Sequence, residues 1–291
     1  MNRGGGAARP AASPAGRLAG KVALITGAGS EGDWYGTGAA TAVAMAACGA
    51  RVAVVDVSQP RAAAIVTAIT SAGGEAMPAV ADATSSEDCR RAAAAVAERF
   101  GPVTVLVNNL GAAVPGSVTE VDEDSWNRAL ALNLTSVMLM SRAVLPQMAA
   151  AGGGSVINVS SISSLRGSGR AAAYAAAKGG VNSLTVEMAV AHGRQGIRVN
   201  CVVPGHLYTP IGAQAGAEMR DLRRRAGLLG TEGDASDVAW AAVFLASDES
   251  RYITAALLPV DAGVTAVAPL ALLPQLTQAP PSPGLISHKR V

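Results

Sequence analysis

Three side chains that together can move a proton to or from an alcohol oxygen stand close in the sequence. Tyr174 and Lys178 lie four residues apart in an alanine-rich run typical of a helix, so they project from one face of it. An ammonium near a phenol stabilises the ionised phenol and lowers its pKa from about 10, as a general acid/base requires. A Tyr–Lys pair at this spacing is common on protein surfaces, but Ser161, thirteen residues before Tyr174, adds a third polar group. Ser160 is the alternative serine, and its side chain should point to the opposite side of the strand.

A glycine-rich turn precedes the first helix-like segment of the chain. Gly27 follows a short apolar run, and Gly36, Thr37 and Gly38 open the helix-like segment. Glycine lets backbone amides approach a pyrophosphate closely, and the amino end of a helix offers unpaired N–H groups to it. Glycine also serves ordinary tight turns, but its place between a strand and a helix predicts that a dinucleotide binds here.

An aspartate ends the second apolar run. Asp56 stands 29 residues after Gly27. A carboxylate at this place can accept hydrogen bonds from both hydroxyls of an adenosine ribose and would repel a 2′-phosphate, so it favours NAD over NADP. The alternative is an aspartate that caps the helix beginning near Ser58 and Pro60.

Polar residues also follow the third and fourth apolar runs. Asp82 and Ala83 could meet the adenine edge of a dinucleotide, and Asn108 and Asn109 could hold its central part. Each pair could instead form only an Asx turn.

Apolar runs that suit strands alternate with helix-like segments through the middle of the chain. We expect strands at 22–26, 51–56, 75–81, 103–108, 155–160, 198–203 and 257–260, and helices at 38–48, 60–72, 85–100, 123–150, 172–195 and 235–246. Continuous apolar strands indicate a sheet that is covered on both faces, and the alternation requires right-handed crossovers. The sequence therefore predicts an α/β fold, with a single Rossmann-type, doubly wound parallel sheet of about seven strands and helices on both faces.

The composition excludes several classes of protein. Half of the residues are hydrophobic, 3% are aromatic and 15% are charged, which indicates a core of closely packed small residues and not a disordered chain. A net charge of +2 supplies no field for nucleic acid, and no apolar run reaches the roughly 20 residues that span a membrane, so neither partner is expected. The three cysteines and three histidines lack metal-ligand spacing, so we expect no metal and a reduced, cytoplasmic setting.

We expect one catalytic domain at 18–264 between two tails. Residues 1–17 lack the compact apolar stretch of a secretory signal and are expected to be a flexible leader. Residues 265–291 contain five prolines, which prevent a regular helix or a central strand, so an irregular tail is expected there.

Taken in order, the motifs resemble the short-chain dehydrogenase/reductase family over about 18–264. The matching residues are Thr26-Gly27, Gly36-Thr37-Gly38, Asn108-Asn109-Leu110-Gly111, Asn133, Ser161, Tyr174 with Lys178, Pro204-Gly205 and Asp261-Ala262-Gly263. Several such motifs in the correct order are far more specific than any one of them.

The resemblance implies a role for each catalytic residue. Tyr174 would be the general acid/base, Ser161 would bind the reacting oxygen, and Lys178 would lower the tyrosine pKa and bind the nicotinamide ribose. Asn133 would keep a water in the proton path, and an Asn inside an apolar helix is independently unfavourable unless its amide is used.

The resemblance also implies contacts around the nicotinamide and an assembly. Leu207 and Thr209 would contact the nicotinamide end of the cofactor, and His206 is a candidate for the substrate pocket. The long helices 123–150 and 172–195 carry small residues that permit close approach, so a homotetramer or homodimer is expected.

The chain departs from the family pattern in places. Eight residues separate Gly27 from Gly36 where three are usual, which is similar to the longer loops of enoyl-reductase relatives. Leu110 and Ala255 replace the usual Ala and Gly, which affects packing more than chemistry. Enoyl reductases use another tyrosine spacing, so Ser161 with Tyr174 favours carbonyl and alcohol chemistry.

The segment 207–230 is expected to form a lid over the substrate, whose apolar residues suit an apolar substrate body or simply pack the lid. Its basic run consists of Arg220, Arg223, Arg224 and Arg225, which we interpret as a solvated helix face, with an anion-recruiting lid as the alternative.

We therefore predict an oxidoreductase that transfers a hydride between NAD(H) and a secondary alcohol or ketone. The alternatives are an NADP(H)-dependent 3-oxoacyl reductase and a non-catalytic nucleotide-binding regulatory protein. The complete set of Asn133, Ser161, Tyr174 and Lys178 disfavours the regulatory protein, because a site without turnover has no physical need for all four.

Overall fold

The computed structural model describes residues 16–30, 35–209 and 216–268, and its centre is a seven-stranded parallel sheet. The strand order is β3-β2-β1-β4-β5-β6-β9, so the direction of winding reverses between β1 and β4. This confirms the predicted doubly wound α/β fold. The strands are β1 (Val22–Thr26), β2 (Arg51–Asp56), β3 (Glu75–Val80), β4 (Val105–Asn108), β5 (Gly154–Val159), β6 (Ile197–Pro204) and β9 (Leu257–Val260).

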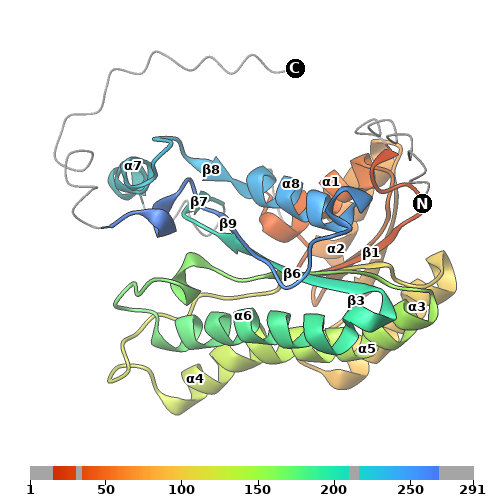
Figure 1. Cartoon of the computed structure of the whole chain (residues 1–291), viewed down its shortest axis with the longest axis horizontal. Coiled ribbons are helices and arrows are strands. Elements are labelled where there is room, and N and C mark those ends of the chain that lie inside the picture. Colours follow the sequence, from red (N-terminus) through yellow and green to blue (C-terminus); the bar gives the residue numbers. More distant parts are fainter. Residues whose placement is uncertain (1–15, 31–34, 210–215, 269–291) are drawn as a thin grey trace, which may run out of the picture.

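Helices cover both faces of the sheet (Figure 1). Three of them share one hydrophobic core with the sheet, namely α1 (Thr37–Ala47), α2 (Gln59–Ser71) and α8 (Ala235–Ala246). On the other face lie α3 (Ser86–Phe100), α4 (Glu123–Leu130), α5 (Ser136–Ala150) and α6 (Ala172–His192).

The core is built from small residues, as the composition predicts. Every residue of β1 is buried, and helix α1 meets α8 through alanines such as Ala39, Ala42 and Ala242. Small side chains let helices approach closely, so few aromatic rings are needed to fill the interior.

A small second sheet was not expected from the sequence. Strands β7 (Leu207–Tyr208) and β8 (Gly233–Asp234) pair in parallel, and α7 (Gly216–Ala226) stands between them in the chain. Two-residue strands carry no hydrophobic periodicity, so sequence patterns do not reveal them.

The expected helix 123–150 is interrupted by a π-helical turn. Residues Ala131–Thr135 form this turn between α4 and α5, and Asn133 is buried in it. The whole run Glu123–Ala150 is long and apolar enough to cross a membrane by length and composition, but half of its most apolar window is buried inside the protein. It is a core helix of this fold.

The described residues include only the inner parts of the two expected tails. Arg17, at the end of the expected leader, forms a bidentate ion pair with Glu249 at 2.7 and 2.8 Å. Thr265, at the start of the expected tail, is buried and donates its hydroxyl to Asp261 at 2.7 Å. The remainder of both tails, 1–15 and 269–291, lies outside the described residues.

Leu106 tests how tightly the sheet is packed. It is fully buried on β4, between Leu24 of β1 and Val156 of β5. Leu106→Ala should lower the free energy of unfolding by about 2–5 kcal/mol, because it removes buried methyl groups and leaves a cavity. Urea denaturation followed by circular dichroism measures this. Val118→Ala, at a side chain that is 79% exposed, should change the same quantity by less than about 0.5 kcal/mol.

Candidate active site

A cavity of about 740 Å³ lies at the carboxyl ends of the central strands, where the strand order reverses. In doubly wound sheets, ligands bind at this place. Most of the residues that the sequence predicts to contact substrate or cofactor line it. They are Gly27, Gly36, Thr37, Gly38, Asp56, Asn109, Ser161, Tyr174, Lys178, Leu207 and Thr209.

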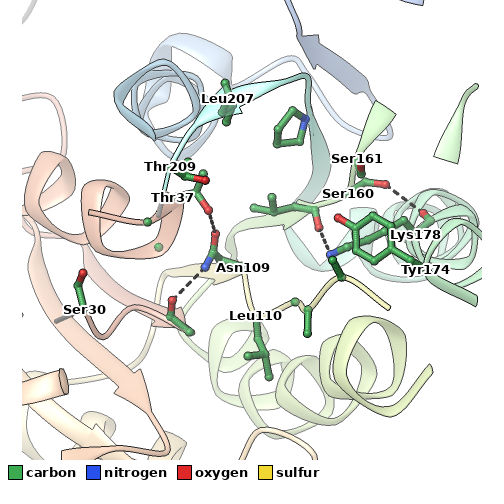
Figure 2. Close-up of a pocket in the computed structure, with 18 of the residues that line it drawn as sticks. Ser30, Thr37, Asn109, Leu110, Ser160, Ser161, Tyr174, Lys178, Leu207 and Thr209 are labelled. Atoms are coloured by element: carbon green, nitrogen blue, oxygen red, sulfur yellow. Dashed lines mark hydrogen bonds between the residues drawn. The ribbon is translucent and has the colours of Figure 1, made fainter. Parts of the chain in front are cut away.

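The cavity has two distinct sides (Figure 2). Ser161, Tyr174 and Lys178 lie together on one side. On the other side lie Thr37, Asn109, Leu207 and Thr209.

The glycine-rich turn leaves the amino end of α1 open to the cavity. Gly36 is the N-cap residue of α1, and in the part of the chain that the structure describes no side chain caps the first N–H groups of this helix. Gly27 adopts a positive φ of 62°, and a Cβ on Gly38 would overlap the Gly27 carbonyl oxygen and the Asn109 amide. Unpaired N–H groups at a helix amino end attract an anion such as a pyrophosphate. The expected loop residues 31–34 lie outside the described residues.

Asn109 connects the turn after β1 to the start of α1 (Figure 2). Its Nδ2 donates to the carbonyl oxygens of Thr26 at 3.2 Å and Gly27 at 3.1 Å. Its Oδ1 accepts a hydrogen bond from the Thr37 hydroxyl at 2.7 Å. One amide therefore fixes β4, the glycine-rich turn and α1 relative to one another.

The carboxylate of Asp56 is buried at the end of β2 and makes four hydrogen bonds. Its Oδ2 accepts from the Gly29 N–H at 3.1 Å, and its Oδ1 accepts from the Ser58 N–H at 2.9 Å. The Arg61 guanidinium donates to the same Oδ1 at 2.8 and 3.1 Å. Arg61 was not predicted from the sequence, although a basic residue in the first turn of α2 after Asp56 is a visible signal.

Ser161, Tyr174 and Lys178 come from two neighbouring elements. Ser161 lies two residues after the end of β5, in extended conformation, and Tyr174 and Lys178 stand one turn apart on α6. The Lys178 Nζ donates to the Val159 carbonyl oxygen at 2.8 Å and lies 5.8 Å from the centre of the Tyr174 ring. The phenol, the hydroxyl and the amine are thus brought to one wall of the cavity.

The pKa of Tyr174 is raised, whereas the sequence analysis expected Lys178 to lower it. Burial of the phenol is the largest cause, and the Ser161 hydroxyl opposes it. Lys178 is itself fully buried, which lowers its pKa to about 8. Burial therefore disfavours the charged form of both side chains.

Ser160 and Ser161 both line the cavity, but their hydroxyls have different partners. The Ser160 hydroxyl is buried and donates to the carbonyl oxygen of Lys178 at 3.0 Å. Ser160 therefore holds helix α6 against β5, while the half-buried Ser161 faces the cavity beside Tyr174 (Figure 2).

Asn133 lies behind the cavity and does not line it. Its Nδ2 donates to the carbonyl oxygens of Ala129 at 2.9 Å and Ala112 at 3.0 Å, and its Oδ1 accepts from the Ala112 N–H at 3.1 Å. Gly111 separates it from Lys178, since a Cβ there would lie 2.8 Å from the Asn133 Oδ1 and 3.1 Å from the Lys178 Nζ. Its amide is used, but for the loop after β4; the water relay remains a prediction.

Asp82 and Ala83 also do not line the cavity. The Asp82 Oδ1 accepts hydrogen bonds from the Thr84 N–H at 2.8 Å and hydroxyl at 2.7 Å. This geometry matches the Asx turn that the sequence left open as the alternative.

The arginines of α7 lie among carboxylates of the same region of the chain. Arg220 pairs with Glu232, and its guanidinium stacks 3.6 Å from the centre of the Tyr208 ring. Arg224 and Arg225 both pair with Asp221. The interpretation as a solvated helix face therefore holds only in part, because Arg223 lines the cavity.

His206 lines the same part of the cavity as Arg223. The residue is exposed, yet desolvation by the surrounding protein lowers its pKa; the nearby Arg223 lowers this pKa further, and Asp261 opposes the shift. The sequence analysis named His206 as a pocket candidate but did not single out Arg223, since all four arginines look alike in the sequence.

The possible metal ligands are scattered in the part of the chain that the structure describes. There, no group of three or more His, Cys, Asp or Glu residues could hold a metal ion. Cys48, Cys89 and Cys201 are buried free thiols, and burial raises the pKa of both Cys89 and Cys201 to about 11, so they stay protonated and inert at neutral pH.

Curated proteins of similar sequence include dehydrogenases that are named for cyclic alcohols. The chain is 39% identical over 249 residues to a 2,5-dichloro-2,5-cyclohexadiene-1,4-diol dehydrogenase of Sphingobium indicum, covering 86% of this chain and 98% of that protein. It is 41% identical over 258 residues to a trans-4-hydroxycyclohexanecarboxylate dehydrogenase of Sinomonas cyclohexanicum, covering 86% and 95%.

Solved structures share the fold. A crystal structure described as a short-chain dehydrogenase/reductase from Burkholderia xenovorans matches with a TM-score of 0.83 and 42% identity, covering 87% of this chain and all of that one. A 7α-hydroxysteroid dehydrogenase in complex with NADH and 7-oxo glycochenodeoxycholic acid matches with a TM-score of 0.80 and 30% identity, covering 86% and 96%.

A family model described as enoyl-(acyl carrier protein) reductase matches residues 33–265. The relatives above extend the match over 86% of the chain and act on alcohols. The chain therefore belongs to the short-chain dehydrogenase/reductase family, and it is an NAD(P)-dependent oxidoreductase that acts on CH–OH groups.

Proposed function

We propose that this protein is an NAD(H)-dependent dehydrogenase that interconverts a cyclic secondary alcohol and its ketone, with Tyr174 as the general acid/base. The observation that carries the proposal is the convergence of Ser161, Tyr174 and Lys178 on one wall of a cavity whose other wall is built for a dinucleotide. The similar proteins named for cyclohexane and cyclohexadiene alcohols support a ring-bearing substrate.

The residues on the dinucleotide side fit a bound NAD. The open amino end of α1 suits the pyrophosphate, and Gly38 leaves no room for a side chain where the backbone must be approached. The buried Asp56 carboxylate suits an adenosine ribose with two free hydroxyls, and it would repel a 2′-phosphate. A relative of known structure binds NADH, which agrees with this choice.

The chain's own residues handle the proton. When bound, the nicotinamide ring supplies the group that accepts or gives the hydride. The Ser161 hydroxyl holds the reacting oxygen, and Tyr174 takes the alcohol proton or returns it to the ketone oxygen. Lys178, with a pKa of about 8, is mostly charged at pH 7 and there attracts the phenolate that forms.

The alternative enzyme is an NADP(H)-dependent 3-oxoacyl reductase. Arg61 beside Asp56 is the observation that favours it, because a guanidinium can bind a 2′-phosphate. Arg61 is held by the Asp56 carboxylate, however, and that carboxylate repels the phosphate, so NAD remains the preferred cofactor.

We also propose that the protein assembles as a homodimer or homotetramer through α5 and α6. Met138, Val186 and Val190 are 39%, 43% and 73% exposed on these outer helices, and an apolar face of this kind favours association. A cytoplasmic location is part of the same proposal, supported by the buried free thiols.

Replacing Tyr174 should abolish the proton transfer. Tyr174→Phe should lower kcat for cyclic alcohols by about 10²–10⁴-fold, because the general acid/base is lost, while NADH still binds. NADH absorbance measures the rate and NADH fluorescence measures the binding. Tyr252→Phe, at a side chain that is 99% exposed, is the control and should behave as wild type.

The wild-type pH profile tests the same role. Oxidation needs the unprotonated phenol, and burial raises the pKa of Tyr174, so kcat/KM for oxidation should climb from pH 7 into the alkaline range. A profile that falls over this range contradicts Tyr174 as the base.

Gly38→Ala should prevent dinucleotide binding, because the added Cβ would overlap the Gly27 carbonyl and displace the Asn109 amide. We expect the Kd of NADH to rise at least about tenfold in a fluorescence titration, which corresponds to about 1.4 kcal/mol. Gly193→Ala, where a Cβ meets nothing within 4 Å, is the control. Equal NADH affinity in the two variants would show that the turn does not hold the cofactor.

Asp56→Ala should change the cofactor preference. Removing the carboxylate that binds the ribose should raise the KM for NAD about tenfold or more, since a hydrogen bond to a charged group contributes about 1.5–3 kcal/mol. NADP should lose less, because the Arg61 guanidinium stays in place without its carboxylate partner. Initial rates with both cofactors measure the ratio. Arg61→Gln is the control that retains the preference for NAD, and equal losses for both cofactors in Asp56→Ala would refute the ribose assignment.

A further inference from the structure

Helix α6 presents a line of polar side chains to the end of β5. Tyr174, Lys178 and Asn182 follow one another at intervals of four residues, so they lie on one face of the helix. Tyr174 and Lys178 line the cavity, and Asn182 is buried one turn further along. A buried amide is costly unless its hydrogen bonds are made, so the partners of Asn182 show what it holds in place.

The Asn182 amide joins β6 to the turn that follows β5. Its Oδ1 accepts a hydrogen bond from the Cys201 thiol at 3.7 Å, and its Nδ2 donates to the Ser164 hydroxyl oxygen at 2.8 Å. Burial raises the pKa of Cys201 to about 11, so the thiol keeps its proton at neutral pH and acts as the donor. The amide is therefore oriented with its oxygen toward β6 and its NH2 group toward Ser164.

Ser164 connects this amide to the backbone of Ser161. Because the Ser164 oxygen accepts from Asn182, its own hydrogen is donated to the Ser161 carbonyl oxygen, at 2.6 Å. The Ser164 N–H donates to the same carbonyl oxygen at 2.9 Å. Both bonds close the 3-10 turn Ile162–Ser164, which begins directly after Ser161. The place of Ser161 therefore depends on a residue that α6 holds.

The side chain of Ser161 is oriented by the same turn. Its Oγ accepts a hydrogen bond from the Ser163 N–H at 3.2 Å. The hydroxyl also interacts with the Tyr174 phenol, where it opposes the rise in pKa that burial causes. A shift of the turn would carry the Ser163 N–H with it and would move the Ser161 hydroxyl relative to the phenol.

We propose that Asn182 and Ser164 are positioning residues that hold the Ser161 hydroxyl against the reacting oxygen of the substrate. A hydroxyl that is already in place stabilises the charge that develops on this oxygen without reorganising in the transition state, so its loss lowers kcat. This inference rests on the proposed function, because it assumes that Ser161 binds the reacting oxygen.

Removing either hydrogen-bonding group from the full chain tests the inference. Asn182→Leu replaces the amide with an apolar side chain of similar size, and Ser164→Ala removes one hydroxyl from a half-buried position. Each should lower kcat at least about fivefold for the cyclohexanol derivative that wild type oxidises fastest with NAD, because the reacting groups are misplaced. The Kd of NADH, measured by fluorescence, should stay as in wild type. Ser164→Thr retains the hydroxyl and should keep most of the activity.

A double variant tests whether the two residues act through one chain of hydrogen bonds. If they do, Asn182→Leu combined with Ser164→Ala should lose no more kcat than the more impaired single variant. Independent effects would instead multiply.

The pH profile separates positioning from a general loss of packing. Since the Ser161 hydroxyl opposes the rise in the pKa of Tyr174, its displacement should move the alkaline rise of kcat/KM to higher pH, as Ser161→Ala should. Lys178, whose Nζ lies 5.8 Å from the centre of the Tyr174 ring, is kept in every variant. A purely structural role would lower the thermal midpoint and leave this profile unchanged.

Ser183→Ala is the matched control. Ser183 is exposed on the same helix and directly follows Asn182. Loss of its hydroxyl should leave kcat, NADH affinity and the pH profile as in wild type.

Three results would overturn the inference. The first is full kcat in both Asn182→Leu and Ser164→Ala, the second is a set of losses that multiply in the double variant, and the third is a lowered kcat with an unshifted pH profile. Ser161→Ala distinguishes the inference from the proposed function. If Ser161→Ala loses kcat while the other two variants retain it, only the positioning role is contradicted, whereas full activity in Ser161→Ala contradicts the proposed role of Ser161 itself.

Discussion

Two reciprocal hydrogen bonds between β5 and α6 determine where the reactive side chains lie. The buried Lys178 amine donates to the carbonyl oxygen of Val159, and the buried Ser160 hydroxyl donates to the carbonyl oxygen of Lys178. Each bond joins a side chain of one element to the backbone of the other. Because Tyr174 stands one turn before Lys178 and Ser161 directly follows Ser160, this pair of bonds sets the distance between phenol and hydroxyl.

Burial of Lys178 has an energetic cost that the fold must carry. Taking an ammonium out of water lowers its pKa to about 8, so between that value and its ordinary 10.5 the unfolded chain binds more protons than the folded one. Stability from this residue is therefore lowest below pH 8 and recovers as the pH rises toward 10.5. A residue that weakens the fold near neutral pH and lies in a cavity is typical of functional sites.

On the dinucleotide side of the cavity, close approach of the ligand to the protein backbone matters more than charge. Asn109 joins three segments through one amide, and the glycines leave the backbone of the turn bare. Small side chains are also used elsewhere in the molecule, since the alanine faces of α1 and α8 let the two helices pack in one layer over the sheet. A chain with few aromatic residues thereby builds its core from small buried side chains.

Local patterns in the sequence predict most of this fold, since apolar runs and capping residues act over a few neighbours. All seven strands of the main sheet follow from such runs, and Tyr174, Lys178 and Ser161 follow from helix and strand periodicity. What escapes is set by distant contacts. Sequence patterns do not show that Arg223 lines the cavity while Arg224 does not. They also do not show that Arg61 meets the Asp56 carboxylate, or that burial raises the pKa of Tyr174.

The π-helical turn at Ala131–Thr135 also belongs to these distant effects, and it changes how one long helix is used. An inserted residue turns everything after it by about 100° around the helix axis. The segment before the turn, α4, packs on α6, whereas the segment after it, α5, packs on α3. Shortening the chain by one residue at this point would rotate the apolar face of α5 away from α3 and expose it to water. The π-helical turn therefore lets one continuous helical segment pack against two different helices.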